Sequence, residues 1–459
     1  MIQIDAITHS VTLDADKCKG CTICIKRCPT EAIRVRNGKA VITSDRCIDC
    51  GECIRVCPNH AKKAISDPIS MMDSYKYKVA LPAPSIYGQF KNVTDVNMIL
   101  AGLLETGFDD IYEVALAAQA ISDYLKEIIP GAREKLSGPL ISSACPVVVK
   151  LISIRYPSLV DNVIKVIAPV ELAAIAAREK AVQKTGYLPG EIGIFLISPC
   201  PAKITASKHP IGFDEPVIDG IFSITEMFRT LMPVVEKIKE PKQLSIAGIR
   251  GIGWASSGGE GNAIGESLFV AADGIHNIIR VLDELENDKM QSIRFVELNA
   301  CPGGCVGGCL AVENPFVARA RIQRMSQNMT TERDHNTVVS HFLAPETLAW
   351  RKRLEYEAIL RIDADRSVAL RKLAEMGSIL ESLPGIDCGS CGAPSCRALS
   401  EDVVMGAAHK SDCVFKLREQ MKKLFSEMVE LQEYTPPPFR EPITEDKGAA
   451  NTEQGRPDL

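Results

Sequence analysis

Eight cysteines between Cys18 and Cys57 constrain this chain more than any other feature of its sequence. They form one pattern twice, Cys-x2-Cys-x2-Cys-x3-Cys-Pro, which begins first at Cys18 and again at Cys47. Three thiols on such a tight loop hold three irons of a cubane, and the fourth, before proline, reaches across to the other cluster. The spacing therefore predicts two [4Fe–4S] clusters, one held by Cys18, Cys21, Cys24 and Cys57 and the other by Cys47, Cys50, Cys53 and Cys28.

Zinc knuckles are the alternative for these cysteines, but they rarely carry four thiols at this spacing with the terminal proline, twice. The segment resembles bacterial two-cluster ferredoxins in every ligand. We therefore expect residues 1–75 to form a ferredoxin-like α+β domain, with a short hairpin over 1–16 and a polar linker over 59–76. Two adjacent clusters form an electron wire, which implies a redox centre at its far end.

Length, composition and charge limit the possible functions. The chain has 459 residues, 46% of them hydrophobic, which suffices for two to four domains. A net charge of −5 argues against a nucleic-acid surface. No apolar run is long enough to span a bilayer and the start has no signal-peptide pattern, so a cytoplasmic location is expected. There the 17 cysteines are better explained as ligands than as disulfides.

From residue 77 onward, strand patterns alternate with helix patterns. Strands are expected over 78–82, 110–115, 139–143, 191–198, 217–222 and 293–297, and helices over 96–106, 117–129, 170–184, 225–237 and 265–287. This alternation predicts an α/β domain over 76–344, with mixed or parallel sheets flanked by helices. Cys145, Cys200 and Cys301 each closely follow an expected strand. Because chemistry gathers at the carboxyl ends of such strands, we expect these three thiols to converge.

A fourth thiol, Cys305, follows Cys301 in a glycine-rich stretch. Glycine lets the backbone approach a bound object closely, and thiolates select a soft metal or cluster. Cys145 and Cys200 are the two cysteines that stand alone, so these four are predicted to form one site. Cys309 is left over, and we expect it to be a small buried hydrophobe, with a proton donor or redox-active thiol as the alternatives.

A third group of cysteines lies near the C-terminus. Its spacing, Cys-x2-Cys-x4-Cys-x16-Cys, predicts a further [4Fe–4S] site in a small helical domain over 383–434, with zinc as the alternative; the thiols are Cys388, Cys391, Cys396 and Cys413. It resembles the small iron–sulfur domain of some membrane redox complexes and corrinoid proteins. A helical connector is expected over 345–382 and a disordered tail over 435–459. The basic helix over 315–327, with Arg319, Arg321 and Arg324, is expected to present a solvated face.

Three motifs contain the dispersed cysteines: Ser143-Ala-Cys-Pro146, Ser198-Pro-Cys-Pro-Ala-Lys203 and Asn299-Ala-Cys-Pro-Gly-Gly-Cys305. Together with Pro82-Ala-Pro-Ser85 and the preceding ferredoxin segment, they resemble the catalytic domain of [FeFe] hydrogenases over residues 1 to about 330. The resemblance implies that Cys145, Cys200, Cys301 and Cys305 hold a [4Fe–4S] cubane. It further implies that Cys305 bridges to a two-iron unit bearing CO, cyanide and azadithiolate. Lys203 would contact a cyanide, and Ser85 lies where the family forms a hydrogen bond near a cyanide.

Several positions depart from the prototypes of that family. Ala144 replaces a cysteine that relays protons, and Ala206 replaces a glutamate. Ser198 and Asn299 stand where methionines flank the cofactor, and polar groups there shift cluster potentials. These departures resemble the divergent, sensory branch often called group D, which carries the same C-terminal four-cysteine domain.

Other residues admit both a functional and a structural role. Asp123 and Glu127 lie on the helix that supplies acids for a proton path in the family, although an exposed amphipathic face explains them equally well. The loop over 254–261 superficially resembles a phosphate loop but lacks the Gly-Lys-Ser/Thr ending. The resemblance implies that it packs near the cofactor. His209 and His276 lack paired metal-ligand spacing and are expected to be structural.

Three functions are compatible with these features. The first is an iron–sulfur hydrogenase that interconverts H2 with two protons and two electrons, slowly, through four [4Fe–4S] clusters. The second is a sensor of H2 or redox state that signals to a separate partner. The third is an iron–sulfur electron carrier without the two-iron unit. Expected partners are a ferredoxin or other redox protein and maturation proteins, with no nucleic acid and no membrane span.

Overall fold

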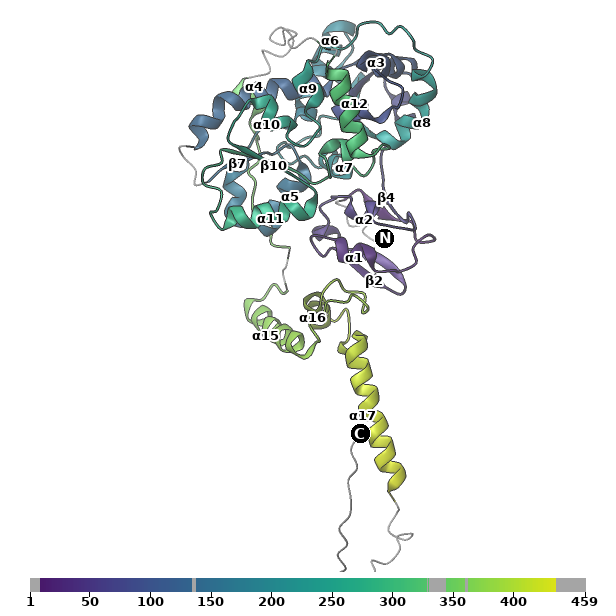
Figure 1. The fold of residues 1–459 in the computed structure, drawn as a ribbon, viewed down its shortest axis with the longest axis vertical. Coiled ribbons are helices and arrows are strands. Elements are labelled where there is room, and N and C mark those ends of the chain that lie inside the picture. Colours follow the sequence, from purple (N-terminus) through teal and green to yellow (C-terminus); the bar gives the residue numbers. More distant parts are fainter. Residues whose placement is uncertain (1–8, 134–137, 328, 330–343, 360–361, 435–459) are drawn as a thin grey trace, which may run out of the picture.

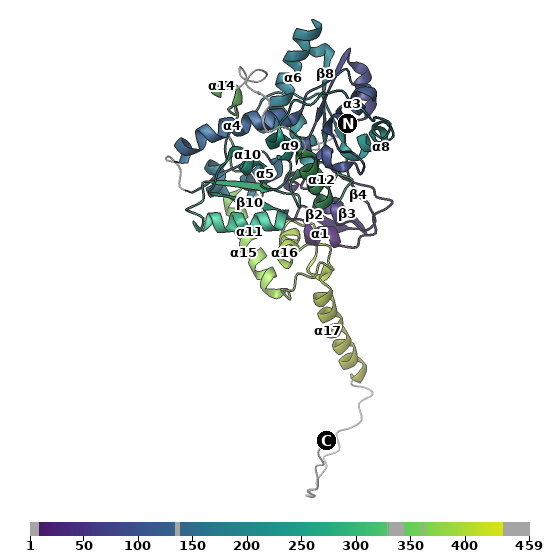
Figure 2. The same ribbon diagram turned by 45° about the horizontal axis from the view of Figure 1, so that its top comes forward.

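The computed structural model describes residues 9–133, 138–327, 329, 344–359 and 362–434 (Figure 1). A large α/β body lies above a small N-terminal unit, and a C-terminal helical unit lies below both. A long helix projects from that last unit, as Figures 1 and 2 both show.

The N-terminal unit is built from two antiparallel strand pairs and two short helices. Strand β1 (Val11–Leu13) pairs with β4 (Lys62–Ala64), and β2 (Ile33–Arg36) pairs with β3 (Lys39–Ile42). Helices α1 (Ile23–Arg27) and α2 (Glu52–Arg55) each contain the third cysteine of one repeat.

Two expectations for this unit are wrong. The supposed linker over 59–76 contains strand β4 and a 3-10 helix, η2 (Ile69–Ser74). The expected N-terminal hairpin does not form over the described residues, because β1 pairs with distant β4; residues 1–8 lie outside the described part. Strand β4 carries mostly polar side chains, which concealed it.

A four-stranded parallel sheet forms the centre of the larger body. Its order is β6-β5-β8-β9, with β5 (Tyr77–Pro82), β6 (Asp110–Ile111), β8 (Ile192–Ser198) and β9 (Gly220–Ser223). Side chains alternate between its faces, so Val79 and Leu81 join one hydrophobic core and Ala80 joins another. Helices α4 (Val114–Arg133) and α6 (Pro169–Thr185) contribute to the first core, and α3 (Val96–Glu105) and α8 (Ile224–Val235) to the second.

A second parallel sheet has the order β10-β11-β7; its strands are β7 (Leu140–Ile141), β10 (Phe269–Asp273) and β11 (Phe295–Asn299). The continuous helix expected over 265–287 is wrong. Helix α10 (Gly259–Ile264) ends at Gly265, strand β10 follows, and α11 (Ile275–Glu286) begins after Gly274. Both glycines have positive φ, which interrupts a helix. The strand expected over 110–115 is also shorter, because α4 begins at Val114.

The carboxyl ends of three strands bring the isolated cysteines together. Cys145 follows β7 and is the N-cap of α5 (Pro146–Arg155), and Cys200 follows β8 and is the N-cap of α7 (Pro201–Lys208). Proline occupies the first helical position in both, where its missing N–H costs nothing. Cys301 follows β11, and Cys305 begins the 3-10 helix η6 (Cys305–Gly307).

The remaining helices cover this body and form the C-terminal unit; they are α9 (Ile249–Gly253), α12 (Pro315–Gln327), α14 (Pro345–Leu348), α15 (Arg366–Ser382), α16 (Cys396–Val404) and α17 (Val414–Glu433). A continuous helical connector over 345–382 is therefore wrong. Between α14 and α15 the described chain is irregular and packs against the α/β body. There the backbone N–H of Trp350 donates a hydrogen bond to the carbonyl oxygen of Lys165. The solvated face expected for α12 holds for Arg319 and Arg324, but Arg321 is largely buried and paired with Glu313.

Candidate functional site

The four isolated thiols, Cys145, Cys200, Cys301 and Cys305, lie close together and are partly buried. Burial raises the pKa of the Cys200 thiol, and the nearby Cys145 and Cys305 raise it further. Burial likewise raises the pKa of Cys301, with Cys200 and Cys305 among the groups that add to it. The N–H groups at the start of α5 and α7 lie beside this set, and helix N-termini favour negative charge. The arrangement therefore suits an anionic, thiolate-bound cluster.

The glycines on either side of Cys305 are required by contacts with the chain itself. A Cβ on Gly304, whose φ is +90°, would lie 2.5 Å from the Ser257 nitrogen, and one on Gly308 would lie 2.5 Å from the Pro199 carbonyl oxygen. The loop thus packs backbone against backbone on Ser257 and on Pro199, the residue before Cys200. This close approach fixes the position of Cys305 relative to the other thiols.

Lys203 faces the thiol set from the first turn of α7. Its Nζ lies 3.5 Å from the Ala144 carbonyl oxygen, and its side chain is only partly exposed. Burial alone would lower the pKa of Lys203, but the neighbouring Cys305, Cys200 and Cys145 raise it above its usual value. An ammonium held this way is a suitable contact for an anionic ligand.

Ser85 and Ser198 lie next to the same set. Ser85 is fully buried, and its Oγ has no hydrogen-bond partner among the described residues. Its 3-10 helix, η3 (Pro84–Gln89), packs against η6, which begins at Cys305. An unsatisfied buried hydroxyl is costly, so an acceptor from a bound group fits this position. Ser198 instead accepts a 3.3 Å hydrogen bond from the Cys200 N–H.

Two buried glutamates near the thiols were missed by the sequence reasoning. Glu297 accepts hydrogen bonds from the N–H groups of Gly258 and Gly261, both 2.9 Å, and from Asn299 at 2.8 Å. Ser142 donates a 2.6 Å hydrogen bond to Glu260. Burial, and then the charge of Glu297, raise the pKa of Glu260 to about 8. An acidic residue at the end of an apolar strand was the signal that could have revealed Glu297.

The candidate acids Asp123 and Glu127 are placed differently. Asp123 pairs with Arg250 of α9, and Glu127 is exposed. Close to Ala144 there is instead a small cavity of about 40 Å³, lined in part by Lys203, Glu171 and Ala206. That volume is enough for a water molecule beside the position where the prototype thiol is missing.

The eight N-terminal thiols gather in the two groups that the spacing predicts. Burial raises the pKa of Cys24, and its neighbouring thiols are Cys21, Cys18 and Cys57. Cys50 is close to Cys28, Cys53 and Cys47. Lys62 lies between the groups, with 3% of its surface exposed and no hydrogen-bond partner for Nζ among the described residues. A buried, unpaired ammonium is unfavourable alone, but it fits beside anionic clusters.

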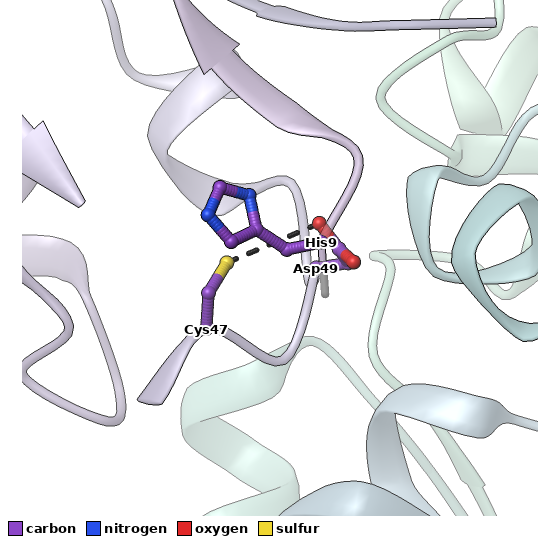
Figure 3. Close-up of side chains that lie close together, drawn as sticks. All are labelled: His9, Cys47 and Asp49. Carbon is purple, nitrogen blue, oxygen red and sulfur yellow. Dashed lines mark hydrogen bonds between the residues drawn. The ribbon is translucent and has the colours of Figure 1, made fainter. Parts of the chain in front are cut away.

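Asp49 joins this unit to the α/β body. It accepts hydrogen bonds from the N–H groups of Ser10 and Val11 and from Thr205 of α7, the last at 2.5 Å. Figure 3 shows His9 and Cys47 beside it, with potential ligand atoms within 4.8 Å of one another. Because Cys47 already belongs to a thiol group, this trio is part of the cluster surroundings.

Cys309 lies at the same junction. Its Sγ lies against Gly51, next to Cys50, since a Cβ added to Gly51 would lie 2.3 Å from the Cys309 Sγ. Cys309 is also close enough to Cys301 to raise the pKa of that thiol. Burial raises the pKa of Cys309 to about 12, which favours the neutral thiol and is compatible with the expected role as a small buried hydrophobe. His209 and His276 are both exposed.

The C-terminal thiols lie in a unit that docks on the N-terminal one. Cys391 is close to Cys388 and Cys413, and Cys396 packs in the same core. The carbonyl of Gly392 accepts a 2.8 Å hydrogen bond from the Val35 N–H. Arg34 and Arg36 both pair with Asp402, at 2.7 and 2.5 Å, and Arg46 pairs with Glu401. The Cys388–Cys391 loop thereby contacts α1, which carries Cys24.

Replacement of Asp402 with alanine is expected to loosen this docking. Arg34 and Asp402 are both about 10% exposed, so the change leaves a nearly buried guanidinium without its carboxylate partner. A loss of about 2–4 kcal/mol of docking stability follows, measurable by hydrogen exchange at the interface. Glu419→Ala, which removes an exposed pair with Lys416, is the control and should cost under about 1 kcal/mol. Equal protection of the interface in both variants would contradict the prediction.

An α/β protein in which thiols gather in several groups of four belongs to the iron–sulfur redox proteins. Comparison with known families specifies which one. The model "Iron only hydrogenase large subunit, C-terminal domain" matches residues 76–259 and 220–309. A 4Fe-4S dicluster domain matches residues 10–58, and an iron–sulfur cluster domain matches 383–415. The chain belongs to the iron-only hydrogenase large subunit family.

Individual relatives are distant. The periplasmic [Fe] hydrogenase large subunit of Nitratidesulfovibrio vulgaris is 26% identical over 65% of this chain and 86% of its own length. Iron hydrogenase 1 of Clostridium pasteurianum is 23% identical over 66% of this chain, and the match spans 65% of that protein. A solved [FeFe]-hydrogenase structure matches 65% of this chain and 97% of its own, with 14% identity and a TM-score of 0.50. The structural match confirms the α/β fold, and the family matches over 10–58 and 383–415 confirm the iron–sulfur regions.

The location of the protein stays a prediction. Among the described helices, none is both long and apolar enough to cross a bilayer. One matched relative is described as periplasmic, so membership of the family does not fix the compartment.

Proposed function

We propose that this protein interconverts H2 with protons and electrons at a cofactor held by Cys145, Cys200, Cys301 and Cys305. The convergence of these four partly buried thiols around Lys203 supports the proposal most directly. The unsatisfied hydroxyl of Ser85, beside the segment that begins at Cys305, adds to it. Both features suit a cubane joined to a two-iron unit with anionic ligands.

Each residue has a distinct role in this proposal. When bound, the two-iron unit would supply an open iron as Lewis acid and an amine as base. Cys305 would bridge it to the cubane, while Lys203 and Ser85 would hold cyanide ligands in place. Ser198 orients the Cys200 backbone, and Asn299 orients Glu297. Packing of the surrounding loops would exclude water from the reacting centre.

Electrons would travel between this centre and the C-terminal unit. The N-terminal thiol groups lie between the two, with Asp49 and Cys309 at one junction and the Arg34–Asp402 pair at the other. Cys388 is exposed, so a [4Fe–4S] cluster there would be accessible to a redox partner. Four [4Fe–4S] clusters in line are the relay that this arrangement supports.

Infrared spectroscopy after maturation with the two-iron unit tests the proposal. We expect CO and cyanide bands from a protein-bound two-iron unit, together with H2-dependent changes in those bands. Absence of the bands in a protein whose cubanes are loaded would instead favour an iron–sulfur carrier.

A sensor of H2 is the second candidate function, and Ala144 favours it, since alanine cannot relay a proton. Turnover with a small dye separates the two functions. Slow turnover with clear H2-dependent spectral changes would support sensing through a separate partner. Rates like those of prototypical hydrogenases would exclude a purely sensory role.

A further inference from the structure

Helix α17 presents a long apolar stripe that nothing in the described structure covers. Its side chains are spaced alternately three and four residues apart and are between 45% and 72% exposed; they are Val414, Leu417, Met421, Leu424, Met428 and Leu431. Figures 1 and 2 both show the helix projecting away from the rest of the molecule. The described element that it packs against most is the short turn η8 (Lys410–Asp412) at its base.

A helix of this kind is not expected to be stable alone in water. Isolated helices of about 20 residues are marginal unless an apolar face is buried. The ion pairs on α17, Lys416–Glu419 and Lys423–Glu427, are exposed and supply little stability. Some other surface must therefore cover the stripe.

The stripe has the pattern of a coiled coil. In a heptad assignment, Leu417, Leu424 and Leu431 occupy every d position, while Val414, Met421 and Met428 occupy the a positions. Leucine at d, combined with a β-branched residue at a, favours two-stranded packing in parallel coiled coils, and Val414 supplies such a residue at the first a position. We propose that α17 pairs with α17 of a second copy of this chain, in a parallel, in-register coiled coil.

The side-chain charges along α17 and the area that pairing would bury are both compatible with a second copy of the helix. In a parallel pair, Gln420 faces Phe425 and Glu427 faces Gln432 across the seam, so no like charges meet. The lysines Lys416, Lys422 and Lys423 lie on the outer positions. Pairing would bury on the order of 500 Å² of the solvent-accessible surface of the six stripe residues in each chain. The total of about 1,000 Å² reaches the size of a specific interface.

The pairing would act directly on the C-terminal iron–sulfur unit. Cys413, the fourth thiol of that unit, is the N-cap of α17. Two copies joined here would hold their C-terminal thiol groups side by side at the base of the coiled coil. The inference does not depend on H2 chemistry, because it rests on the helix alone.

Light scattering of the anaerobically purified full chain tests the pairing. The wild type is expected at twice the 49.9 kDa mass of one chain. Leu424→Asp, which places a charge in the seam, should reduce the mass to that of one chain. Ser426→Asp adds the same charge on the outer face of the same helix and should stay at twice the mass. Unchanged visible absorbance of the clusters would show that both variants are folded.

Two results would overturn the proposal: a wild type at the mass of one chain, or Leu424→Asp at the same mass as Ser426→Asp. A photoreactive benzoylphenylalanine in place of Met428 tests the orientation without involving the native thiols. A parallel pair joins this position to the same region of the second copy. Cross-links near Leu417 would overturn the parallel arrangement.

Discussion

Replacement of Lys203 with methionine is expected to abolish retention of the two-iron unit while the cubane stays bound. The four thiols are unchanged in this variant, so the iron–sulfur site keeps its ligands. The substitution removes the one ammonium group that the described structure places beside those thiols. The Nζ of this lysine lies 3.5 Å from the Ala144 carbonyl oxygen. Methionine has similar length but no charge or donor. We expect CO and cyanide band intensity per cubane to fall at least about tenfold, and turnover to fall by about 10²-fold or more.

Lys208→Met provides the matched control, because it lies on the same helix and pairs with Asp67 at the exposed surface. It should keep wild-type band intensity. Lys203→Arg separates charge from shape, since a guanidinium keeps the charge but presents a planar fork in a confined space. Wild-type infrared bands in Lys203→Met would show that Lys203 does not hold the anionic ligands.

The thiol groups were predictable because their geometry depends on sequence spacing and on strand ends. The double repeat places its cysteines in two mixed groups. The carboxyl ends of β7 and β11 in one sheet, and of β8 in the other, bring Cys145, Cys301 and Cys200 together. The resemblance to hydrogenases, carried by three short motifs, was confirmed by the match to the family over residues 76–309.

Features that depend on long-range packing were not predictable. Strand β4 has a polar sequence, and the strand that it pairs with, β1, lies about fifty residues earlier. Strand β10 was predicted as part of a helix because its apolar run also fits a helical pattern. Parallel pairing with β11 is what makes this segment a strand. Glu260 is an ionisable residue, yet it is only 4% exposed in the fold. No local signal distinguishes such a residue from a surface glutamate.

Replacement of Glu260 with glutamine is expected to slow H2 turnover by about 10²-fold, because this carboxyl is the best-placed group to move protons in the absence of a thiol at position 144. Ser142 connects Glu260 to position 144. Its hydroxyl donates a 2.6 Å hydrogen bond to Glu260 and accepts a 3.2 Å hydrogen bond from the Ala144 N–H. Glu297 accepts several N–H groups and therefore holds the negative charge of the pair, which leaves the exchangeable proton on Glu260.

The pH dependence gives this prediction a second readout. Burial, followed by the charge of Glu297, raises the pKa of Glu260 to about 8 from the usual 4.5. H2 oxidation needs an acceptor, so its rate should rise with pH through about 8, and proton reduction should fall over the same range. Glu260→Gln should remove this inflection. The raised folded-state pKa also means that wild-type stability falls as pH rises from about 4.5 to 8, whereas the variant should respond less.

Two further variants make the assignment decisive. Glu171→Gln changes a partly buried carboxyl, which accepts a hydrogen bond from the Ala168 N–H at 2.8 Å and lines the cavity beside Ala144. It should leave turnover within a few-fold of wild type if protons pass through Glu260. Ala144→Cys, combined with Glu260→Gln, restores a thiol at the prototype position and should recover much of the lost turnover. A large loss in Glu171→Gln with none in Glu260→Gln would place the proton route in the cavity instead.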